Sequence, residues 1–381
     1  MQYCKICVMP DTRPGIKFKD GICCPCLNFQ RRKSINWKAR WKELEKLVTK
    51  YRGSKGNDYD CIVTVSSGKD SHYQVYTIKE RLKMNPLLLS IDNWSWTKTG
   101  IKNKENIQER FGCDMLTLTL NRRAAKKMLK KGLEHNLIPT WYWDRAVYSY
   151  PLQMAIKFQI PLIIYGENIN YEYGGSQAKE TSSALDQINN NVAKPTPWKV
   201  WLDKNITMKD LNPLICPAEK EIKKAKLNPI YLSYFEPWDG YQNYKLAKKL
   251  GFRSLEKEWI REGLAENYEQ IDTVGYSVHS WLKFPKFGHQ HNTDILAQWI
   301  RSGRISRKKA VELVKKNEHV LDKRMLKDFV EFIGITEKKF WSVVDKFANK
   351  NILEKQHGQW RLKPAVITAL EKGRKVRQVS S

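Results

Sequence analysis

Apolar positions along the chain change their spacing twice, and each change marks a different kind of segment. After a first stretch without a regular hydrophobic pattern, apolar side chains recur at helical spacing from Trp37 to Tyr51, which predicts an amphipathic helix. Short β-branched and apolar runs then alternate with helical stretches. The runs predict strands over 61–65, 87–91, 115–118 and 162–165, and the stretches predict helices over 72–83, 102–110 and 148–158.

Beyond about residue 245 the strand signals become rare and helical patterns dominate. The predicted helices cover 294–301, 307–316, 323–332 and 336–349. The last of them precedes the segment from Ile352 to Leu362, in which His357 and Gly358 predict the turn of a hairpin. A helix followed by a hairpin resembles a winged helix, and this interpretation covers residues 320–365.

Alternating strands and helices are typical of an α/β fold, so we expect a doubly wound, mainly parallel sheet with helices on both faces. The pattern divides the chain into a small knuckle over 1–35, an α/β domain over 36–245 and a mainly helical C-terminal module over 246–381.

Composition narrows the class of protein. The chain has 68 Lys and Arg against 40 Asp and Glu, a net charge of +28, which suggests an anionic partner such as nucleic acid, a nucleotide-linked substrate or an acidic protein. A solvated lysine-rich surface without such a partner remains the alternative.

No apolar run approaches the roughly 20 residues of a membrane-spanning helix. The N-terminus has no apolar signal region, and eight cysteines suit a reducing compartment, so we expect a cytoplasmic protein with no membrane contact.

Five of the eight cysteines lie within the first 30 residues. Cys4 and Cys7 form one C-x-x-C pair and Cys23 and Cys26 a second, which is the spacing of a tetrahedral zinc site with four thiolates. Cys24 is an alternative to Cys23, although only Cys23 keeps the two-residue gap to Cys26. Four protein ligands close the coordination shell, so we expect Zn²⁺ with a structural role.

A phosphate-binding loop is predicted between the strand over 61–65 and the helix that follows it. The segment Val65-Ser-Ser-Gly-Lys-Asp-Ser71 has small residues that let backbone amides approach an anion, and its spacing differs from that of a Walker A loop. It resembles the PP-loop of ATP pyrophosphatases, which cleave ATP between the α- and β-phosphates. Ser67 stands where glycine is usual, and a positive φ there would add strain.

Other polar residues follow predicted strands. Gly166, Glu167 and Asn168 come after the strand over 162–165, and Asp92 comes after the strand over 87–91. Because ligands of open α/β sheets bind beyond the carboxyl ends of the strands, we expect these residues in the same ATP site as Val65, Ser66, Ser67, Gly68 and Lys69.

The order of motifs along nearly the whole chain resembles that of the N-acetyl sugar amidotransferases. The motifs are Cys4-x-x-Cys-Val-Met-Pro-Asp-Thr-Arg-Pro-Gly15, the second cysteine pair, the PP-loop, Gly166-Glu-Asn168, Pro237-Trp-Asp239, Lys286-Phe-Gly288, Thr293-Asp294 and Arg301-x-Gly-Arg-Ile-Ser-Arg307. Members of the pseudaminic-acid and lipopolysaccharide branch convert an acetamido group on a nucleotide-activated sugar into an acetamidino group. The resemblance also implies that Trp238 and Asp239 contact substrate.

That reaction requires activation of an amide by ATP. The resemblance implies that the acetamido oxygen attacks the α-phosphate, pyrophosphate leaves, and ammonia then displaces AMP. Lys69, Asp70 and Ser71 are the candidate catalytic residues, with Asp70 as a contact to Mg²⁺ and Lys69 and Ser71 on the leaving pyrophosphate. Arg145 is a candidate for a phosphate or carboxylate of the substrate.

The source of ammonia is predicted to lie outside the chain. No cysteine stands at position 1 or 2 for an N-terminal glutaminase nucleophile, and Gly112-Cys113-Asp114 lacks the second glycine of a glutaminase nucleophile turn. We therefore expect a glutaminase partner similar to the HisH-like subunits of histidine biosynthesis, with a HisF-like cyclase-type subunit as a possible companion.

Two other functions fit parts of the pattern. A tRNA thiolation enzyme of the PP-loop class would use a cysteine beside the loop, for which Cys61, Cys113 and Cys216 are the candidates. A winged-helix regulator with a degenerate nucleotide site would bind DNA without releasing pyrophosphate. Nucleic acid is the less favoured partner, and His289 with His291 lacks the nearby carboxylate motif expected of a metal site.

Overall fold

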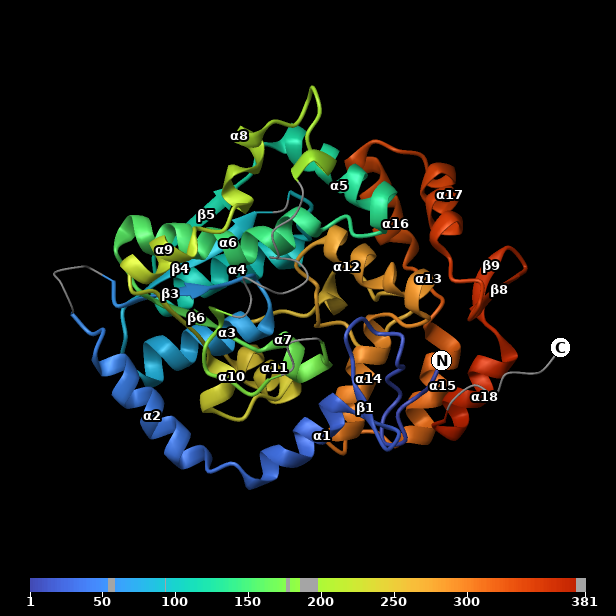
Figure 1. The fold of residues 1–381 in the computed structure, drawn as a ribbon, viewed down its shortest axis with the longest axis horizontal. Coiled ribbons are helices and arrows are strands. Elements are labelled where there is room, and N and C mark those ends of the chain that lie inside the picture. Colours follow the sequence, from blue (N-terminus) through green and yellow to red (C-terminus); the bar gives the residue numbers. More distant parts are fainter. Residues whose placement is uncertain (54–58, 93, 176–178, 186–197, 375–381) are drawn as a thin grey trace.

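A five-stranded parallel sheet forms the centre of the protein (Figure 1). The computed structural model describes residues 1–53, 59–92, 94–175, 179–185 and 198–374. The strands lie side by side in the order β5-β4-β3-β6-β7, and every adjacent pair is parallel. Their bounds are β3 Cys61–Thr64, β4 Pro86–Asp92, β5 Met115–Thr119, β6 Leu162–Tyr165 and β7 Asn228–Tyr231.

The sheet confirms the expected α/β class and the four predicted strands. The fifth strand, β7, was not predicted, because its short run contains Pro229. Proline cannot donate a ladder hydrogen bond and is confined mostly to edge strands, which is where β7 lies.

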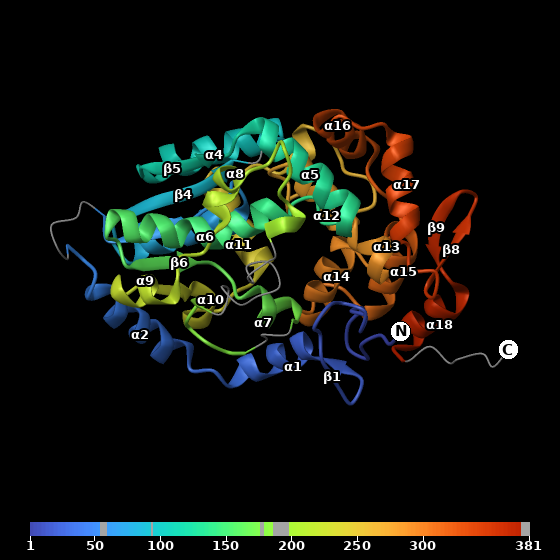
Figure 2. The ribbon, with the colours of Figure 1, turned by 45° about the horizontal axis from the view of Figure 1, so that its top comes forward.

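Both faces of the sheet are buried, as a doubly wound sheet requires. Cys61 and Val63 of β3 face a core that includes Leu44 of α2. Ile62, between them, faces a different core that includes Leu152 of α6. The sheet therefore lies between α2 on one face and α6 on the other, as can be followed in Figures 1 and 2.

The helices of the first two thirds of the chain follow the predicted pattern with shifted bounds. Helix α6 begins seven residues before the expected start and runs through Pro151, and the helix expected over 72–83 changes from α to π geometry at Tyr76. Helix α5 was not predicted.

The remaining elements of this part of the chain are β1 Phe18–Lys19, β2 Ile22–Cys23, α1 Cys24–Arg31, η1 Arg32–Ser34, α2 Trp37–Thr49, α3 Lys69–Val75, η3 Tyr76–Arg81, α4 Lys98–Phe111, α5 Arg122–Asn136, α6 Trp141–Phe158, α7 Ile169–Tyr173, η5 Trp198–Val200, α8 Met208–Leu211, η6 Asn212–Leu214, α9 Glu219–Lys224, α10 Leu232–Phe235, α11 Gly240–Lys249 and η7 Leu255–Lys257.

The C-terminal part is mainly helical, as expected, and ends in the predicted hairpin followed by one more helix. Its elements are α12 Val274–Trp281, α13 Lys283–Phe287, α14 His291–Arg301, α15 Arg307–Asn317, α16 Lys323–Ile333, α17 Glu337–Phe347, β8 Leu353–Gln356, β9 Gln359–Leu362 and α18 Pro364–Lys372. None of the helices in the described ranges has the length and apolarity needed to cross a membrane.

The N-terminal knuckle packs against the C-terminal helices. Tyr3 and the paired cysteines share one core with side chains of α14 to α18. The backbone amide of Tyr3 donates to the carbonyl of Arg374 at 3.2 Å, so the first and last described segments are in direct contact. Figure 2 shows the knuckle beside α14, α15 and α18.

Candidate functional site

The predicted phosphate-binding loop lies where the strand order of the sheet reverses. β3 has β4 on one side and β6 on the other, and the loops after β3 and β6 therefore leave the same edge of the sheet in opposite directions. This is the position at which open α/β sheets bind ligands. The loop connects β3 directly to α3.

Hydrogen bonds within the loop fix its shape. Ser71 Oγ accepts from the amide of Ser66 at 2.9 Å, and Ser66 Oγ accepts from the amide of Gly68 at 3.0 Å. The backbone of Ser67 lies outside the left-handed region, as does that of Gly68 with a φ of −74°. The strain that a positive φ would have placed on Ser67 is therefore absent.

Lys69 is a buried cation held by two carboxylates. Its side chain is 3% exposed, and Nζ lies 2.5 Å from Asp70 Oδ2 and 2.9 Å from Glu269 Oε1. Burial lowers the pKa of Lys69, but the charges of Asp70 and Glu269 more than offset this and leave the pKa raised. Asn243 Nδ2 donates to the other oxygen of Asp70 at 2.8 Å. Lys69 therefore carries a fixed positive charge at the loop.

A cavity of about 320 Å³ opens at this edge of the sheet. It is lined by the ends of β3 and β4, by the loop, and by residues within 268–276 of the C-terminal part, of which Glu269 and Asp272 contact the loop. A cavity of this size is in the range of ligand sites in proteins. Its polar and aromatic lining residues include Ser66, Lys69, Asp70, Trp96, Trp143, Glu167, Tyr173, Tyr268, Glu269, Gln270, Asp272, Tyr276 and His291.

Four carboxylates and one lysine therefore share the cavity. Burial, followed by the negative charge of Asp70, raises the pKa of Glu167 to about 7. Burial also raises the pKa of Glu269 to about 8, although Lys69 opposes the shift. Asp272 Oδ2 accepts from the amide of Ser67 at 3.4 Å, and burial raises the pKa of Asp272. The site therefore concentrates more carboxyl groups than its single lysine can pair with, and burial favours the protonated form of three of them.

Sequence reasoning missed Glu269 and Asp272. Both lie in a segment for which no chemistry was predicted, about 200 residues from the loop that they contact. One feature of the sequence could have identified them: Glu266, Glu269 and Asp272 form an acidic cluster in a C-terminal module that is otherwise rich in lysine and arginine.

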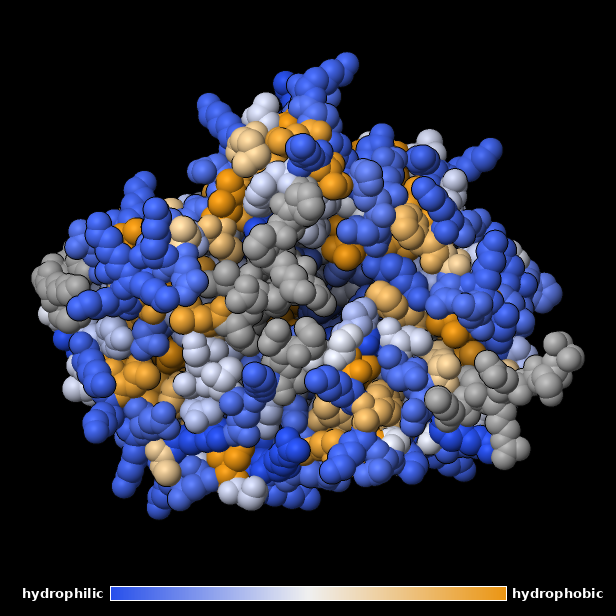
Figure 3. All heavy atoms as spheres, in the orientation of Figure 1, coloured by the Kyte–Doolittle hydropathy of each residue, from blue (hydrophilic) through white to orange (hydrophobic). Residues whose placement is uncertain are grey.

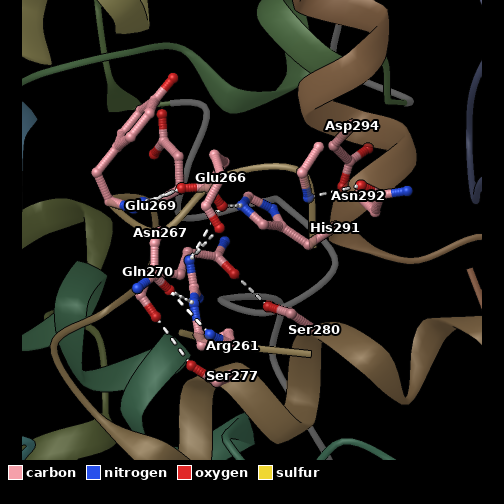
Figure 4. Close-up of polar contacts among 12 residues, drawn as sticks. Arg261, Glu266, Asn267, Glu269, Gln270, Ser277, Ser280, His291, Asn292 and Asp294 are labelled. Atoms are coloured by element: carbon pink, nitrogen blue, oxygen red, sulfur yellow. Dashed lines mark hydrogen bonds and ion pairs between the residues drawn. The ribbon is translucent and has the colours of Figure 1, made fainter. Parts of the chain in front are cut away.

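A buried polar network fixes this acidic segment (Figure 4). Glu266 pairs with Arg261 at 3.0 Å, and its other carboxylate oxygen accepts from the amides of Tyr268 and Glu269 at 2.6 and 2.7 Å. Ser277 Oγ donates to the carbonyl of Gln270 at 2.9 Å. Glu269 is therefore presented to Lys69 from a rigid loop.

The remaining predicted site residues lie at varying distances from the cavity. Val65, Ser66, Gly68 and Glu167 line it, whereas Asn168 caps α7 by accepting from the amide of Tyr171. A side chain at Gly166 would lie 3.0 Å from Trp238, so this glycine permits close packing. Asp92 accepts from Nε1 of Trp96 at 2.7 Å and thus supports a lining residue.

The three predicted substrate contacts are separated from this cavity. Arg145 is 3% exposed, and its Nε donates to the carbonyl of Leu214 at 2.7 Å on the outer side of α6. Asp239 caps α11 by accepting from the amides of Tyr241 and Gln242. Trp238 and Asp239 line a smaller neighbouring cavity. Substrate binding by these three residues stays a prediction.

The four predicted metal ligands come together in the knuckle. The sulfur atoms of Cys4, Cys7, Cys23 and Cys26 all lie within 4.8 Å of one another, and all four side chains are buried. The amide of Cys23 points at Cys4 Sγ, 3.4 Å away. Cys24 is outside the group, which decides between the two adjacent cysteines. The arrangement is that of a metal site.

No cysteine lines the large cavity within the described ranges. Cys61 is fully buried in β3, Cys113 is 8% exposed, and Cys216 is half-buried beside α6. The three candidates for sulfur chemistry are therefore held away from the loop.

Comparison with known proteins agrees with part of the resemblance noted in the sequence. Residues 262–366 match the family model described as "LPS biosynthesis protein WbpG-like, C-terminal domain". The matched segment contains Glu269 and Asp272, so the part of the cavity lining that contacts the loop is similar to lipopolysaccharide biosynthesis proteins.

A curated relative is the uncharacterized protein MJ1599 of Methanocaldococcus jannaschii, 32% identical over 187 residues. The alignment covers 49% of this chain and 65% of the relative, slightly less than two thirds of its length.

Two solved structures are distantly similar. NMN synthetase from Francisella tularensis is 10% identical with a TM-score of 0.39, and the match covers 75% of this chain and 94% of that one. The U34-tRNA thiolase NcsA from Methanococcus maripaludis with its 4Fe-4S cluster is 15% identical with a TM-score of 0.32, over 75% of this chain and 82% of that one. Likenesses of this extent carry no conclusion about the chemistry of this chain.

Proposed function

We propose that this protein is an ATP-dependent amidotransferase that acts in the cytoplasm on a nucleotide-activated N-acetyl sugar. The acetamido oxygen attacks the α-phosphate of ATP, an O–P bond forms, and the bond to the β-phosphate breaks with release of pyrophosphate. Ammonia then forms a C–N bond to the activated carbon, and AMP leaves with the former amide oxygen. The product is an acetamidino sugar for a surface glycan such as a lipopolysaccharide or a pseudaminic or legionaminic acid.

One observation carries the proposal. The cavity at the switch point of the sheet is lined both by the predicted phosphate-binding loop and by residues within 268–276, and the latter belong to the segment that matches lipopolysaccharide biosynthesis proteins. The loop to which we assign the activation of ATP and a segment similar to lipopolysaccharide biosynthesis proteins therefore line the same cavity.

The residues of the loop and of the start of α3 suit the release of pyrophosphate. The first amides of α3, which have no acceptor within the helix, and the hydroxyls of Ser66 and Ser71 supply hydrogen-bond donors, and Lys69 supplies a cation that is already buried. Such preorganised groups stabilise charge that develops on a leaving group without reorganising during the reaction. Lys69 is the residue on which we expect turnover to depend most.

The carboxylates of the cavity fit Mg²⁺. This ion prefers oxygen ligands and is usually held by one or two carboxylates together with phosphates of the substrate. Asp70, Glu167 and Asp272 line the cavity and would hold it. When bound, Mg²⁺ neutralises phosphate charge and so offsets the surplus of carboxylates in the site.

The knuckle fits Zn²⁺. The Sγ atoms of Cys4 and Cys26 are 3.9 Å apart and those of Cys7 and Cys23 are 3.6 Å apart. The edge of a tetrahedron with Zn–S bonds of ~2.3 Å is about 3.8 Å long. With four thiolates the ion has no open position, so its role in the proposal is structural.

Ammonia is expected from a separate glutaminase subunit of the histidine-biosynthesis type, for which the chain itself has no nucleophile motif. A tRNA thiolation enzyme is the less supported alternative, because Cys61, Cys113 and Cys216 do not line the cavity. Retention of full turnover by a Cys216→Ser variant would count further against it.

The direct test is to incubate the protein with ATP, Mg²⁺, ammonium and candidate nucleotide-linked N-acetyl sugars. We expect AMP, pyrophosphate and a sugar in which mass spectrometry detects NH in place of one oxygen. Reactions without sugar or without ammonium are the controls. Formation of ADP, or AMP release that no sugar stimulates, would contradict the proposed function.

A further inference from the structure

A second, smaller cavity lies directly beside the large one. Its volume is about 40 Å³, and it shares a wall with the large cavity that consists of Lys69, Asp70, Glu167 and Tyr173. Lys69, the proposed catalytic lysine, therefore lines both cavities. The shared wall belongs to the loop after β3 and to the segment that follows β6.

The small cavity reaches the ammonium group of Lys69. Gly240, at the first position of α11, lines this cavity, and a methyl group at Gly240 would lie 3.2 Å from Lys69 Nζ. It would also lie 3.4 Å from Glu269 Oε1. The absence of a side chain at Gly240 therefore leaves space beside the catalytic lysine.

The two cavities are built from different parts of the molecule. The large cavity is bounded by α6 and residues 268–276, whereas the small one is bounded by the knuckle and by the C-terminal end of α14. Phe29 of α1 and Arg32 contribute from the knuckle side, and Gln298 and Ser302 contribute from α14 and its end. The four-cysteine knuckle thus forms part of a second approach to the loop.

Size decides what this second approach admits. A cavity needs roughly 10–15 Å³ to hold one water molecule, so about 40 Å³ admits one or a few molecules of that size and excludes a sugar or a nucleotide. The carboxylates of Asp70, Glu167, Glu172 and Asp239 line it together with Arg32, Lys69 and Arg301, and Arg32 pairs with Glu172 and Lys69 with Asp70. Because these charges nearly balance, the cavity suits a small neutral molecule that forms hydrogen bonds.

We propose that the small cavity is the entrance through which ammonia reaches the activated sugar, separate from the cavity that admits ATP and the sugar. This inference rests on the proposed function, in which ammonia is the one reactant of matching size. Ammonia enters as the neutral molecule, its nitrogen bonds to the activated carbon, a carboxylate of the shared wall takes up the proton that the nitrogen loses, and the C–O bond to AMP breaks. A partner that supplies ammonia would accordingly dock on the face formed by the knuckle and the end of α14.

Ser302 at the exposed rim allows a test. A Ser302→Trp variant places a large ring at the opening, and we expect it to raise the KM for ammonium about tenfold or more while the KM values for ATP and sugar change little. Sugar-dependent exchange of pyrophosphate into ATP, measured without ammonium, reports formation of the adenylated sugar alone and should be retained. Ionic strength is kept constant, because the chain carries a net charge of +28.

The matched control is Lys308→Trp, which adds the same ring on an exposed position of α15 outside both cavities. An unchanged KM for ammonium in Ser302→Trp would overturn the separate entrance, as would a parallel loss of pyrophosphate exchange in that variant. Absence of sugar-dependent exchange in the wild-type protein would instead overturn the proposed function itself.

Discussion

The residues that define the candidate ATP site are charged side chains that lie close together inside the protein. Lys69 lies between Asp70 and Glu269, with Asn243 on the far oxygen of Asp70, so each charge in this group has a partner. Such an arrangement is costly to disrupt, because removing one partner leaves the other charge buried and unpaired. The same burial keeps Lys69 in one position in front of the loop.

Lys69→Met should therefore affect both stability and activity. We expect a loss of about 3–5 kcal/mol in the free energy of unfolding, because Asp70 and Glu269 lose their partner. Sugar-dependent pyrophosphate exchange should fall by about 100-fold or more. The double variant Lys69→Met, Glu269→Gln should recover much of the stability and none of the activity. Lys223→Met breaks an exposed pair with Glu219 and should leave the free energy of unfolding nearly unchanged. Equal losses in the two lysine variants would refute this account.

The backbone at Ser67 gives a second prediction at this scale. Because its φ is not left-handed, Ser67→Gly relieves no strain and adds freedom to the unfolded chain. We expect the unfolding free energy, measured in denaturant, to fall by about 0.4–1 kcal/mol. A gain in stability on this substitution would show that the native loop prefers the usual glycine.

At the scale of elements, the segment around α14 is held by buried polar contacts. Glu318, at the end of α15, is 1% exposed and accepts from the amide of Gln290 and from Nδ2 of Asn292. Burial raises its pKa to about 7, the negative charge of Asp294 adds to the shift, and hydrogen bonds from Gln290, Thr293 and Asn292 oppose it. These contacts tie α15 to the start of α14, which carries His291 at the cavity.

This carboxyl should make stability depend on pH. Its folded-state pKa lies above the ordinary value of 4.5, so the unfolded state loses its proton first and stability falls as pH rises from about 4.5 to about 7. As the pH is raised from 4 to 8, the unfolding free energy of Glu318→Gln should therefore increase relative to that of the wild type by up to about 3 kcal/mol. Thermal unfolding across this range is the measurement. Glu331→Gln, on the exposed side of α16, is the control, and an equal pH response in both variants would contradict the assignment.

At the scale of the whole molecule, the N-terminal knuckle connects the C-terminal part to the rest of the chain. Arg13 pairs with Asp294 of α14 at 2.6 Å, and Arg307 of α15 donates to the carbonyls of Cys4 and Cys7. The surface around these parts is largely hydrophilic in the view of Figure 3, in keeping with the net charge. A metal held by the four cysteines would therefore stabilise contacts between the knuckle and the C-terminal helices.

Loss of the metal should accordingly loosen both ends. We expect Cys7→Ser to abolish the bound zinc measured by elemental analysis and to lower the melting temperature. Hydrogen exchange should increase in α14, α15 and α18, whereas β3, β4 and β6 should keep their protection. Cys24→Ser is the matched control, since Cys24 is adjacent to the group and outside it. Loss of metal in the Cys24 variant, or increased exchange confined to residues 1–35, would contradict this role of the knuckle.

Local spacing in the sequence determined the strands β3 to β6, the loop between β3 and α3, and the cluster of four cysteines. Each of these depends on residues close together in the chain: a buried strand followed by small residues, or two C-x-x-C pairs. The hairpin around His357 and Gly358 is of the same kind.

Only the tertiary structure decided what faces the loop. Glu269 and Asp272 reach it because the chain returns to the sheet edge about 200 residues later, and no local spacing records that return. Conversely, the structure shows that Asn168 and Asp239 cap helices. A polar side chain after a strand or turn can accept from backbone amides just as it can contact a ligand, and local sequence does not distinguish these two roles. Contacts between segments distant in sequence depend on how the helices pack, and the chain defines them only once it is folded.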